Sequence, residues 1–404
     1  MIDLELMRKL SRPSPRKIVL LIIDGLGGLP DPSSGKSELE TAAIPNLDRL
    51  ASRGITGMVD PVGPGITPGS APGHLALFGY DPLKFEIGRG VLEAVGIDVE
   101  LKPGDIAARG NFCTVDENGL VTDRRAGRIS TDTCRELSRL LSDTSLPGVQ
   151  IAVYPVREHR FVVIFRGDDL SSEVTDSDPQ QIGVVPLMVN PVDRSDAGAV
   201  RLAGFVNQFI SEARNCLTDH HPANMVLLRG FSRHPQLPTM QEIYKINPLA
   251  VAIYPMYRGL ARLVGMDIAE TGTTLEDEFE TVRKSYRDHD FFFVHIKWTD
   301  SAGEDGDFSR KVKMLEEIDT ALPVITELNP EVIVVAGDHS TPAVLRGHSW
   351  HPVPVVVVSE YCRIDPVNEF SERAFLGGGL GRMSSTEIIH VAMANALKLR
   401  KYGA

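Results

Sequence analysis

Apolar runs of strand length alternate along the chain with longer stretches in which apolar residues recur at helical spacing. The short runs, rich in β-branched residues, predict buried strands at residues 18–23, 224–230, 290–297 and 331–336. The periodic stretches predict helices at residues 1–10, 44–55, 131–143, 200–217, 257–265, 311–326 and 386–399. Strands separated by helices predict a parallel sheet that helices cover on both faces.

The alternation is interrupted by a segment of short strands around a single helix. Residues 112–123 predict a β-hairpin, and residues 149–167 predict two further strands. We therefore predict a small α+β domain inserted at residues 110–179. The larger domain would be discontinuous, formed by residues 1–109 and 180–404.

Composition narrows the class of protein and of partner. The 404 residues are 42% hydrophobic and 24% charged, which is ordinary for a soluble globular protein. With 42 basic and 54 acidic residues the net charge is −12, which disfavours a nucleic-acid or anionic-membrane partner. The scattered cysteines indicate neither a disulfide framework nor a thiolate zinc site, and the N-terminus is too polar for a signal peptide. We expect a cytoplasmic protein with a small-molecule substrate. The sequence leaves open whether the protein forms a homo-oligomer.

Acidic residues follow the predicted strands at the ends where open α/β sheets bind ligands. Asp24 follows the first strand, Asp300 follows the strand at 290–297, and Asp338 and His339 follow the strand at 331–336. Carboxylate oxygens beside imidazole nitrogens are the ligand mixture of Zn²⁺, Mn²⁺ and similar ions. Each acid also has a simpler interpretation, since an aspartate after a strand often caps the next segment. The glycines after Asp24 lack the GxGxxG spacing, so we reject a dinucleotide site.

A Gly- and Pro-rich loop within residues 63–82 places Ser70 near the start of a predicted helix. Free backbone N–H groups and the helix dipole would stabilise a serine alkoxide or a phosphoserine there, although Ser70 as a simple helix cap is the alternative. Because distant strands all end in metal-binding residues, we predict that these converge with Ser70, Glu304 and His348 on two divalent ions. One ion would activate the Ser70 oxygen and the other would hold a phosphoryl oxygen.

Two clusters of basic residues in the predicted insert indicate a pocket for phosphate or carboxylate groups. They are Arg124, Arg125 and Arg128 after the hairpin, and Arg157, His159 and Arg160 at the second turn. The alternative is a basic turn exposed to solvent. In the metal-centred interpretation, these side chains would neutralise and orient a phosphorylated substrate.

Several segments, in order along the chain, together resemble the archaeal-type, cofactor-independent phosphoglycerate mutases of the alkaline phosphatase superfamily. They are Asp24-Gly, Gly69-SAPGHLALFGYDP, Arg109-GNF, Asp123-RRAGR, His295-IKWTDSAGEDGDF, Ala336-GDHSTP and His348-SWHPVP. The resemblance implies an α/β fold, an alkaline-phosphatase-like three-layer sandwich with a mostly parallel sheet and a small inserted α+β domain that binds substrate.

The resemblance also implies an activity and a set of site residues. The activity is conversion between 3-phosphoglycerate and 2-phosphoglycerate through a phosphoserine on Ser70, without free 2,3-bisphosphoglycerate. One metal site would contain Asp24, Ser70, Asp338 and His339, and the other Asp300, residue 304 and His348. The resemblance matches the arginines only as a basic patch after the hairpin, not as individual contacts. Our predicted substrate-binding set is Arg124, Arg125, Arg128, His159, Arg160 and Lys297.

One position departs from the family motif, which has histidine where this chain has Glu304. A carboxylate adds negative charge and a harder donor, so we expect a preference for Mn²⁺ or Mg²⁺, with Zn²⁺ still open. Two other functions would use the same residues. A phosphohydrolase or phosphotransferase would act on another small hydroxy compound, and a non-enzymatic sensor would bind phosphoglycerate or metal without turnover.

Overall fold

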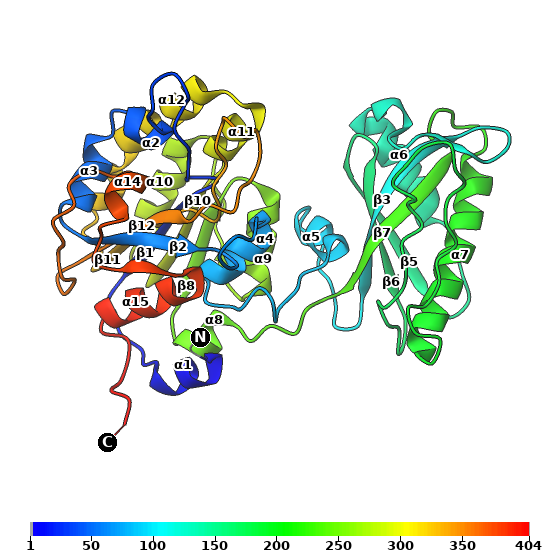
Figure 1. The fold of residues 1–404 in the computed structure, drawn as a ribbon. Helices are drawn as coiled ribbons and strands as arrows, with labels where there is room; N and C mark the ends of the chain where they lie inside the picture. Colours follow the sequence, from blue (N-terminus) through cyan, green and yellow to red (C-terminus); the bar gives the residue numbers. More distant parts are fainter. Residues whose placement is uncertain (1–2, 404) are drawn as a thin grey trace. The chain divides into compact units, whose positions relative to one another are not determined.

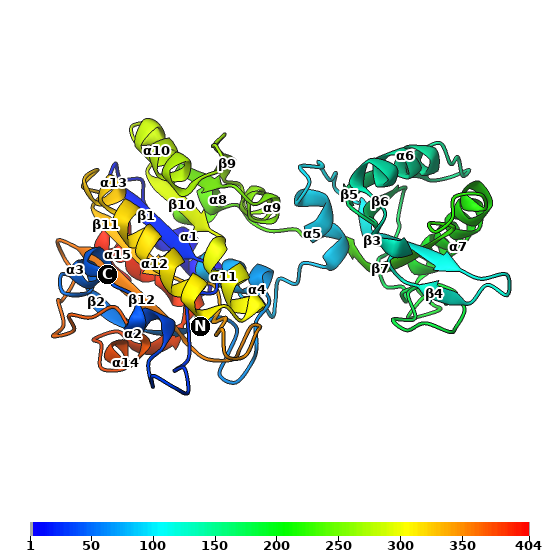
Figure 2. The same cartoon turned by 90° about the horizontal axis from the view of Figure 1, so that it is seen from above.

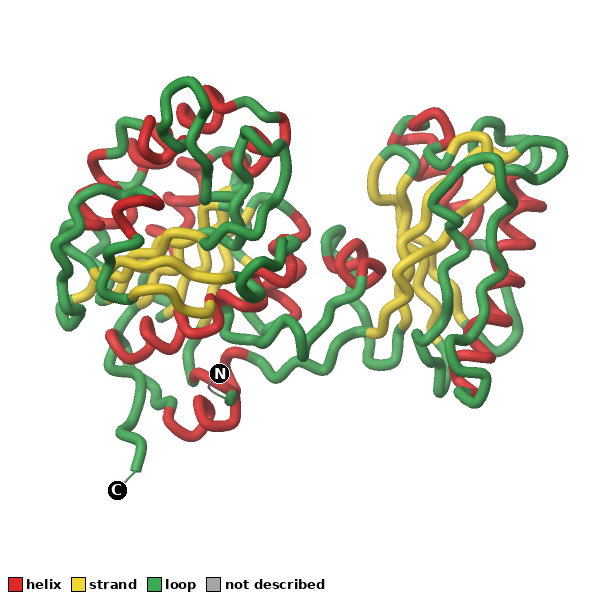
Figure 3. The backbone as a smooth tube through the Cα atoms, in the orientation of Figure 1, coloured by secondary structure: helices red, strands yellow, loops and turns green. Residues whose placement is uncertain are grey.

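The computed structural model describes residues 3–403 and shows two compact units (Figure 1). Unit 1 combines the chain up to Glu86 with the chain from Leu237 onward, and unit 2 comprises Ile87–Gln236. Each unit has a sheet of its own, drawn as separate groups of strands in Figure 3. No helix within residues 3–403 is long and apolar enough to cross a membrane.

Within the described residues, unit 1 is built on an eight-stranded sheet in the order β13-β2-β12-β11-β1-β10-β8-β9. The central strands β11, β1, β10 and β8 are parallel, whereas β12 runs antiparallel to both β11 and β2. The strands are β1 Ile18–Ile23, β2 Ile55–Asp60, β8 Pro248–Ala252, β9 Asp267–Ile268, β10 Phe291–Ile296, β11 Val332–Ala336, β12 Val353–Ser359 and β13 Gly381–Ser384.

The central strands of unit 1 end together at one edge of the sheet. Ile23 of β1 lies opposite Ile296 of β10, and Ile22 lies opposite Ala336 of β11. The backbone N–H of Asp24 donates to the carbonyl of Ile296 at 2.9 Å. Residues that follow these three strands are therefore brought close together, although they are hundreds of residues apart in sequence.

Helices cover both faces of the unit 1 sheet, which keeps its central strands buried. In Figure 1, α3 and α12 lie above the sheet and α15 lies below it, and Figure 2 shows the same helices from above. The helices are α1 Leu4–Leu10, α2 Glu38–Thr41, α3 Pro45–Ala51, α4 Ser70–Leu77, α8 Met240–Tyr244, α9 Pro255–Leu263, α10 Leu275–Ser285, α11 Trp298–Asp305, α12 Phe308–Ala321, α13 Pro323–Thr326, α14 Glu372–Phe375 and α15 Ile388–Asn395, with a 3-10 turn η2 at Ser385–Glu387.

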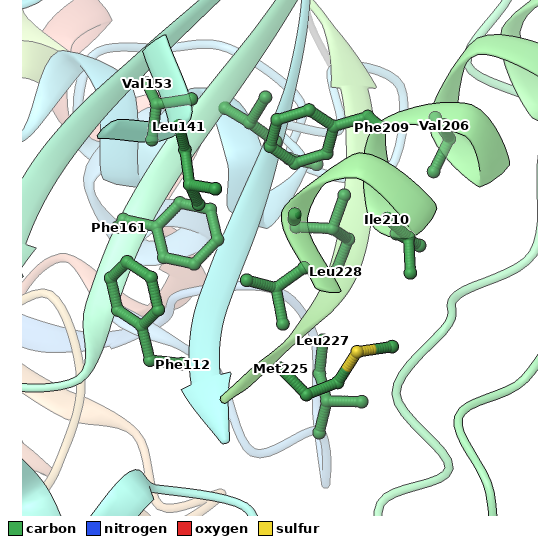
Figure 4. Packing of buried hydrophobic residues seen from close by; sticks show 14 of the residues in the cluster. Phe112, Leu141, Val153, Phe161, Val206, Phe209, Ile210, Met225, Leu227 and Leu228 are labelled. Atoms are coloured by element: carbon green, nitrogen blue, oxygen red, sulfur yellow. The ribbon is translucent and has the colours of Figure 1, made fainter. Parts of the chain in front are cut away.

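Unit 2 is an antiparallel sheet in which β3 pairs with β4, β6 and β7, and β5 pairs with β6. One hydrophobic cluster joins this sheet to α6 and α7; Phe209 of α7, Leu228 of β7 and Phe161 of β6 belong to it (Figure 4). The elements are α5 Arg89–Val95, β3 Ile106–Val115, β4 Val121–Asp123, η1 Ala126–Arg128, α6 Thr131–Ser142, β5 Gln150–Arg157, β6 Arg160–Arg166, α7 Ala197–Leu217 and β7 Met225–Arg233.

The predicted fold class is confirmed: the chain is α/β, with a mostly parallel sheet and a small α+β unit. The predicted limits of the insert, 110 and 179, are corrected to Ile87 and Gln236. The reason is that β7 pairs with β3 and α7 packs on β7, so residues 200–217 and 224–230 belong to unit 2 and not to the larger domain. The single helix predicted at 311–326 is also two helices, α12 and α13, with Pro323 at the start of the second.

Candidate active site

Five of the predicted metal-binding residues meet at the carboxyl edge of the unit 1 sheet. Asp24 follows β1, Asp300 lies in the first turn of α11 after β10, and Asp338 and His339 follow β11. His348 lies in the loop that leads to β12. Apart from His348 these side chains are fully buried or nearly so. The structure thus brings together side chains that the sequence could only place at the ends of separate strands.

The side chains form two groups of three, each with its potential ligand atoms within 4.8 Å of one another. Asp24, Asp338 and His339 make one group, and Asp300, His339 and His348 make the other. His339 Nε2 lies 3.3 Å from Asp24 Oδ1 and 3.2 Å from Asp338 Oδ2. His348 Nε2 lies 3.5 Å from Asp300 Oδ1. His339 therefore stands between the two groups, whereas the family resemblance assigned it to one site.

Hydrogen bonds determine which nitrogen of each imidazole carries the proton. The hydroxyl of Thr341 donates to the Asp300 carboxylate (2.7 Å), so it accepts from His339 Nδ1 (2.9 Å). His348 Nδ1 donates to the carbonyl of Pro68 at 2.9 Å. In both rings, Nε2 is left with a lone pair that faces carboxylate oxygens. Lone pairs and carboxylates arranged in this way are the donor set of a bound cation.

Unpartnered buried oxygens support the same conclusion. Asp24 Oδ1 and Asp338 Oδ2 are both buried and have no hydrogen-bond partner. Burial raises the pKa of Asp338 well above its ordinary value, and the charges of Asp24 and Asp300 raise it further. Buried polar atoms without partners are destabilising unless a ligand satisfies them. A divalent ion that accepts both oxygen and imidazole ligands, such as Mn²⁺ or Zn²⁺, fits this set.

Ser70 is the first residue of α4, and Gly69 occupies the N-cap position. The Ser70 hydroxyl lies 3.3 Å from His339 Nε2, and because that nitrogen carries a lone pair the hydroxyl is the donor. Gly73 allows α4 to approach the ligand loop so closely, because a Cβ there would lie 2.2 Å from the carbonyl oxygen of Asp338. The helix-cap interpretation of Ser70 is therefore wrong, and its hydroxyl points at the candidate metal ligands.

Lys297 lies among the same carboxylates. Its ammonium is 3.1 Å from Asp24 Oδ2 and also donates to Asp300 Oδ2. Burial alone would lower the pKa of Lys297, but the Asp24 and Asp300 carboxylates outweigh burial and raise it. The side chain is therefore a protonated cation that neutralises part of the carboxylate charge.

Glu304 is at the margin of the site. Its Oε1 lies 3.7 Å from His348 Nε2, but its side chain is 54% exposed, and it belongs to neither group of three. His351, three residues after His348, also belongs to neither group; its Nδ1 lies 3.0 Å from the Ser349 hydroxyl and its ring stacks on Trp350.

Three residues that contact the carboxylates were not predicted from the sequence. The Tyr257 hydroxyl donates to Asp24 Oδ2 at 2.5 Å, His295 Nε2 lies 3.3 Å from the same oxygen, and His74 Nδ1 lies 3.2 Å from Asp338 Oδ2. Burial lowers the pKa of His74 and of His295 to about 4, so both rings are neutral. The position of His295, one residue from the end of an apolar strand, could have identified it from the sequence. His74 and Tyr257 lie within helices, and no sequence pattern marked them as neighbours of the carboxylates.

The predicted basic residues of unit 2 differ in their surroundings. Arg124 forms a bidentate pair with Asp178, at 3.0 and 2.7 Å, and His159 is 3% exposed with no hydrogen bond to Nδ1. Arg125, Arg128 and Arg160 are exposed. Burial lowers the pKa of His159 to about 4, and the charge of Arg160 is the next largest cause. His159 is thus a neutral, buried side chain in a cationic environment.

Two arginines of this cluster were not selected from the sequence. Arg109 of β3 and Arg229 of β7 are cross-strand partners, with side chains only 12% and 18% exposed. Burial lowers the pKa of Arg109 to about 10, and Arg160 and Arg229 contribute to the shift. Arg109 pairs with Glu93 at 3.3 Å, and Arg229 Nη1 lies 3.9 Å from Asp178. Like charges directly opposite on a sheet destabilise it, so this arrangement favours a bound anion.

Comparison with known proteins agrees with the geometry. Residues 51–224 match the family described as 2,3-bisphosphoglycerate-independent phosphoglycerate mutase. The chain is 47% identical over 407 residues to a protein of Thermosipho africanus named as a probable enzyme of this kind, with 100% of both chains covered. The chain belongs to this family. It is therefore an isomerase, a cofactor-independent phosphoglycerate mutase.

Other relatives of this mutase family extend the comparison. A Thermotoga maritima protein with the same name is 48% identical over 402 residues, with 99% of both chains covered. Among solved structures, the cofactor-independent phosphoglycerate mutase of Thermoplasma acidophilum is 32% identical with a TM-score of 0.77, covering 94% of this chain and all of that one. A Pyrococcus horikoshii protein is 28% identical with a TM-score of 0.82, covering 98% of this chain and all of that one. The family and the fold predicted from the sequence are both confirmed.

Proposed function

We propose that this enzyme interconverts 3-phosphoglycerate and 2-phosphoglycerate through a phosphoserine on Ser70 beside two divalent metal ions, and that it serves glycolysis and gluconeogenesis in the cytoplasm. The observation that carries this proposal is the position of the Ser70 hydroxyl, 3.3 Å from His339 Nε2, whose ligand group includes two buried carboxylate oxygens, Asp24 Oδ1 and Asp338 Oδ2, without a hydrogen-bond partner. A serine that only stabilised the helix would not need these surroundings.

The metal ions would be held by the two groups of three side chains, with Ser70 added to the first and Glu304 to the second. When bound, they would supply positive charge that lowers the pKa of the serine hydroxyl and offsets the charge of the phosphoryl group. We propose Mn²⁺ or Mg²⁺, because a carboxylate at residue 304 is a harder donor than imidazole.

Two transfers would complete the reaction. Ser70 Oγ forms a bond to phosphorus while the bond from phosphorus to the substrate's O3 breaks, and the proton lost by the serine ends on the released hydroxyl. The O2 oxygen of glycerate then forms a bond to the same phosphorus while the bond to Oγ breaks, and the serine regains a proton. The N-terminus of α4 would stabilise the negative charge on the phosphoserine.

The basic cluster of unit 2 would bind the carboxylate and phosphate of the substrate. The proposed set in unit 2 is Arg109, Arg124, Arg125, Arg128, His159, Arg160 and Arg229. Lys297 is proposed separately as a substrate-binding residue of unit 1. Arg109 and Arg229 support the proposal best, because each is mostly buried and positively charged beside a second arginine.

Arg229→Met should weaken substrate binding. We expect KM for 3-phosphoglycerate to rise by about 10- to 100-fold with a smaller change in kcat, because a hydrogen bond to a charged group contributes about 1.5–3 kcal/mol. Arg214→Met is the matched control, since Arg214 is exposed on α7 of the same unit. Steady-state kinetics test both variants, and an unchanged KM in Arg229→Met would remove Arg229 from the substrate-binding set.

Glu304→His should change the metal preference without changing the fold. A neutral imidazole in place of the carboxylate should shift the ion that gives the highest activity from Mn²⁺ or Mg²⁺ towards Zn²⁺. Asp305→His is the control, because Asp305 lies next on the same helix but pairs with Arg310 at 2.7 Å. Activity is measured across a panel of divalent ions. An identical metal profile in wild type and Glu304→His would place Glu304 outside the coordination sphere.

The mutase reaction itself is tested with purified protein, 3-phosphoglycerate, divalent ions and a coupled enolase assay, with free phosphate measured in the same samples. We expect isomer formation to exceed phosphate release by a wide margin. Phosphate release without isomer would support the phosphohydrolase alternative. Neither product with any divalent ion would contradict the proposal.

A further inference from the structure

Lys311 of α12 is a fully buried lysine whose ammonium donates to the backbone of two loops and lies farther from the Glu38 carboxylate. Its Nζ donates to the carbonyls of Gly25 at 2.9 Å, Gly27 at 3.0 Å and Thr341 at 2.9 Å. An ammonium has three donors and no acceptor, so these three bonds use its full hydrogen-bonding capacity.

The three carbonyls belong to the loops that carry the candidate metal ligands. Gly25 and Gly27 directly follow Asp24, and Thr341 lies two residues after His339. The loops also pair with each other, because the N–H of Thr341 donates to the carbonyl of Gly27 at 3.0 Å. Lys311 therefore connects the loop after Asp24 to the loop that carries Asp338 and His339, the other two members of the same group of potential ligands.

Two glutamates, the buried Glu38 and the partly buried Glu372, add hydrogen-bond acceptors to this arrangement. Glu38 accepts from the backbone N–H of Leu29 at 3.2 Å and of Ala343 at 2.8 Å, so it also joins the two loops. Glu372 accepts from Gly28 N–H at 2.7 Å. The fit is close, since a Cβ on Gly28 would lie 2.0 Å from Glu38 Oε2. The Lys311 ammonium lies 3.9 Å from Glu38 Oε1, which balances its charge.

Core stability alone does not explain a buried charge of this kind. Replacing a buried ion pair by apolar side chains of similar volume is often neutral or stabilising. The contacts of Lys311 are instead what a rigid ligand geometry requires, because ligand carboxylates and imidazoles bind an ion only when their backbones are held at fixed spacing.

We propose that Lys311 is a positioning residue of the metal centre, which fixes the distance between Asp24 and the Asp338-His339 pair by tying their loops together. This inference rests on the proposed metal site. It predicts that loss of Lys311 weakens metal binding even in a folded protein, by about the 10- to 100-fold seen when a supporting partner of a metal ligand is removed.

Mn²⁺ binding to the full-length protein tests this without reference to catalysis. Free Mn²⁺ is measured by electron paramagnetic resonance during titration of wild type, Lys311→Met and Lys313→Met. Lys313 is the matched control, because it lies on the same helix but is 71% exposed and pairs only loosely with Glu317, at 3.6 Å. We expect wild-type affinity for Lys313→Met and a 10- to 100-fold weaker affinity for Lys311→Met.

A second pair of variants separates positioning from folding. Lys311→Met leaves Glu38 as an uncompensated buried charge, so the variant is also made in a Glu38→Gln background, where that charge is absent. We expect the double variant to unfold at a higher temperature than Lys311→Met but to bind Mn²⁺ more weakly than Glu38→Gln alone. The proposal would be overturned if Lys311→Met bound Mn²⁺ as tightly as wild type, or if the double variant bound it as tightly as Glu38→Gln alone.

The remaining outcomes are also decisive. Failure of both Lys311 variants to fold would overturn the proposal, because Lys311 would then be a requirement of the fold and not of the metal centre. Failure of the wild-type protein to bind Mn²⁺ would contradict the metal site in the proposed function, which is a separate result from equal affinity in wild type and variant.

Discussion

Ser70→Ala should abolish mutase turnover while leaving the protein folded. We expect kcat to fall by at least about 10³-fold, because the phosphoryl group loses the oxygen that would carry it between the two positions of the substrate. The fold should persist, since Gly69 and not Ser70 is at the N-cap of α4 and the Ser70 side chain makes no capping hydrogen bond to that helix. Coupled-assay kinetics measure the loss, and circular dichroism checks the fold.

The phosphoenzyme gives a direct test of the same variant. Wild type incubated with 3-phosphoglycerate and rapidly quenched should show, by mass spectrometry, one added phosphoryl group on the peptide that contains Ser70. Ser70→Ala should show none. Ser52→Ala is the control, because Ser52 is exposed and its hydroxyl donates to the carbonyl of Arg49 in α3, so this variant should behave as wild type. Turnover by Ser70→Ala at a rate close to wild type would exclude the phosphoserine.

Removal of divalent ions should eliminate activity and lower the melting temperature. Asp24, Asp300 and Asp338 are buried within one small region, and without cations their negative charges repel one another. A ligand that binds only the folded state at about 100 times its Kd adds roughly 2.7 kcal/mol to the free energy of unfolding. We therefore expect chelator-treated enzyme to be inactive and less stable, and Mn²⁺ to restore both properties.

Asp24→Asn serves as the control for this effect. The amide keeps the size of the side chain but lacks the charge of the carboxylate, so Mn²⁺ should raise the melting temperature of this variant much less than that of wild type. Calorimetry with and without Mn²⁺ compares the two. A chelator-treated wild type with full activity would show that catalysis does not need the ions.

The pattern of apolar residues correctly predicted the central strands of the sheet that carries the site. The runs at 18–23, 290–297 and 331–336 became β1, β10 and β11, because a strand buried on both faces must be apolar along its length. The antiparallel strands β2 and β12 were not predicted. Their direction depends on which neighbour they pair with, and hydrogen bonds between distant strands leave no local mark in the sequence.

The division into units was harder to predict for the same reason. Residues 200–217 and 224–230 show the same alternation of helix and strand patterns as the larger domain, yet they form α7 and β7 of unit 2. Helix and strand periodicity describes one element at a time. The pairing of β7 with β3, more than 100 residues earlier, is a tertiary contact that periodicity does not contain.

The amino-acid sequence by itself determined the chemical types at the site and the strand ends that present them: Asp24, Asp300, Asp338 and His339, with Ser70 at a helix start. Only the tertiary structure decided that His339 stands between two groups of ligands, that Thr341 fixes its tautomer, and that Lys311 ties the loops together. Side-chain types are local properties of a chain. Distances between groups hundreds of residues apart are set by packing and by hydrogen bonds that form only when the sheet is assembled.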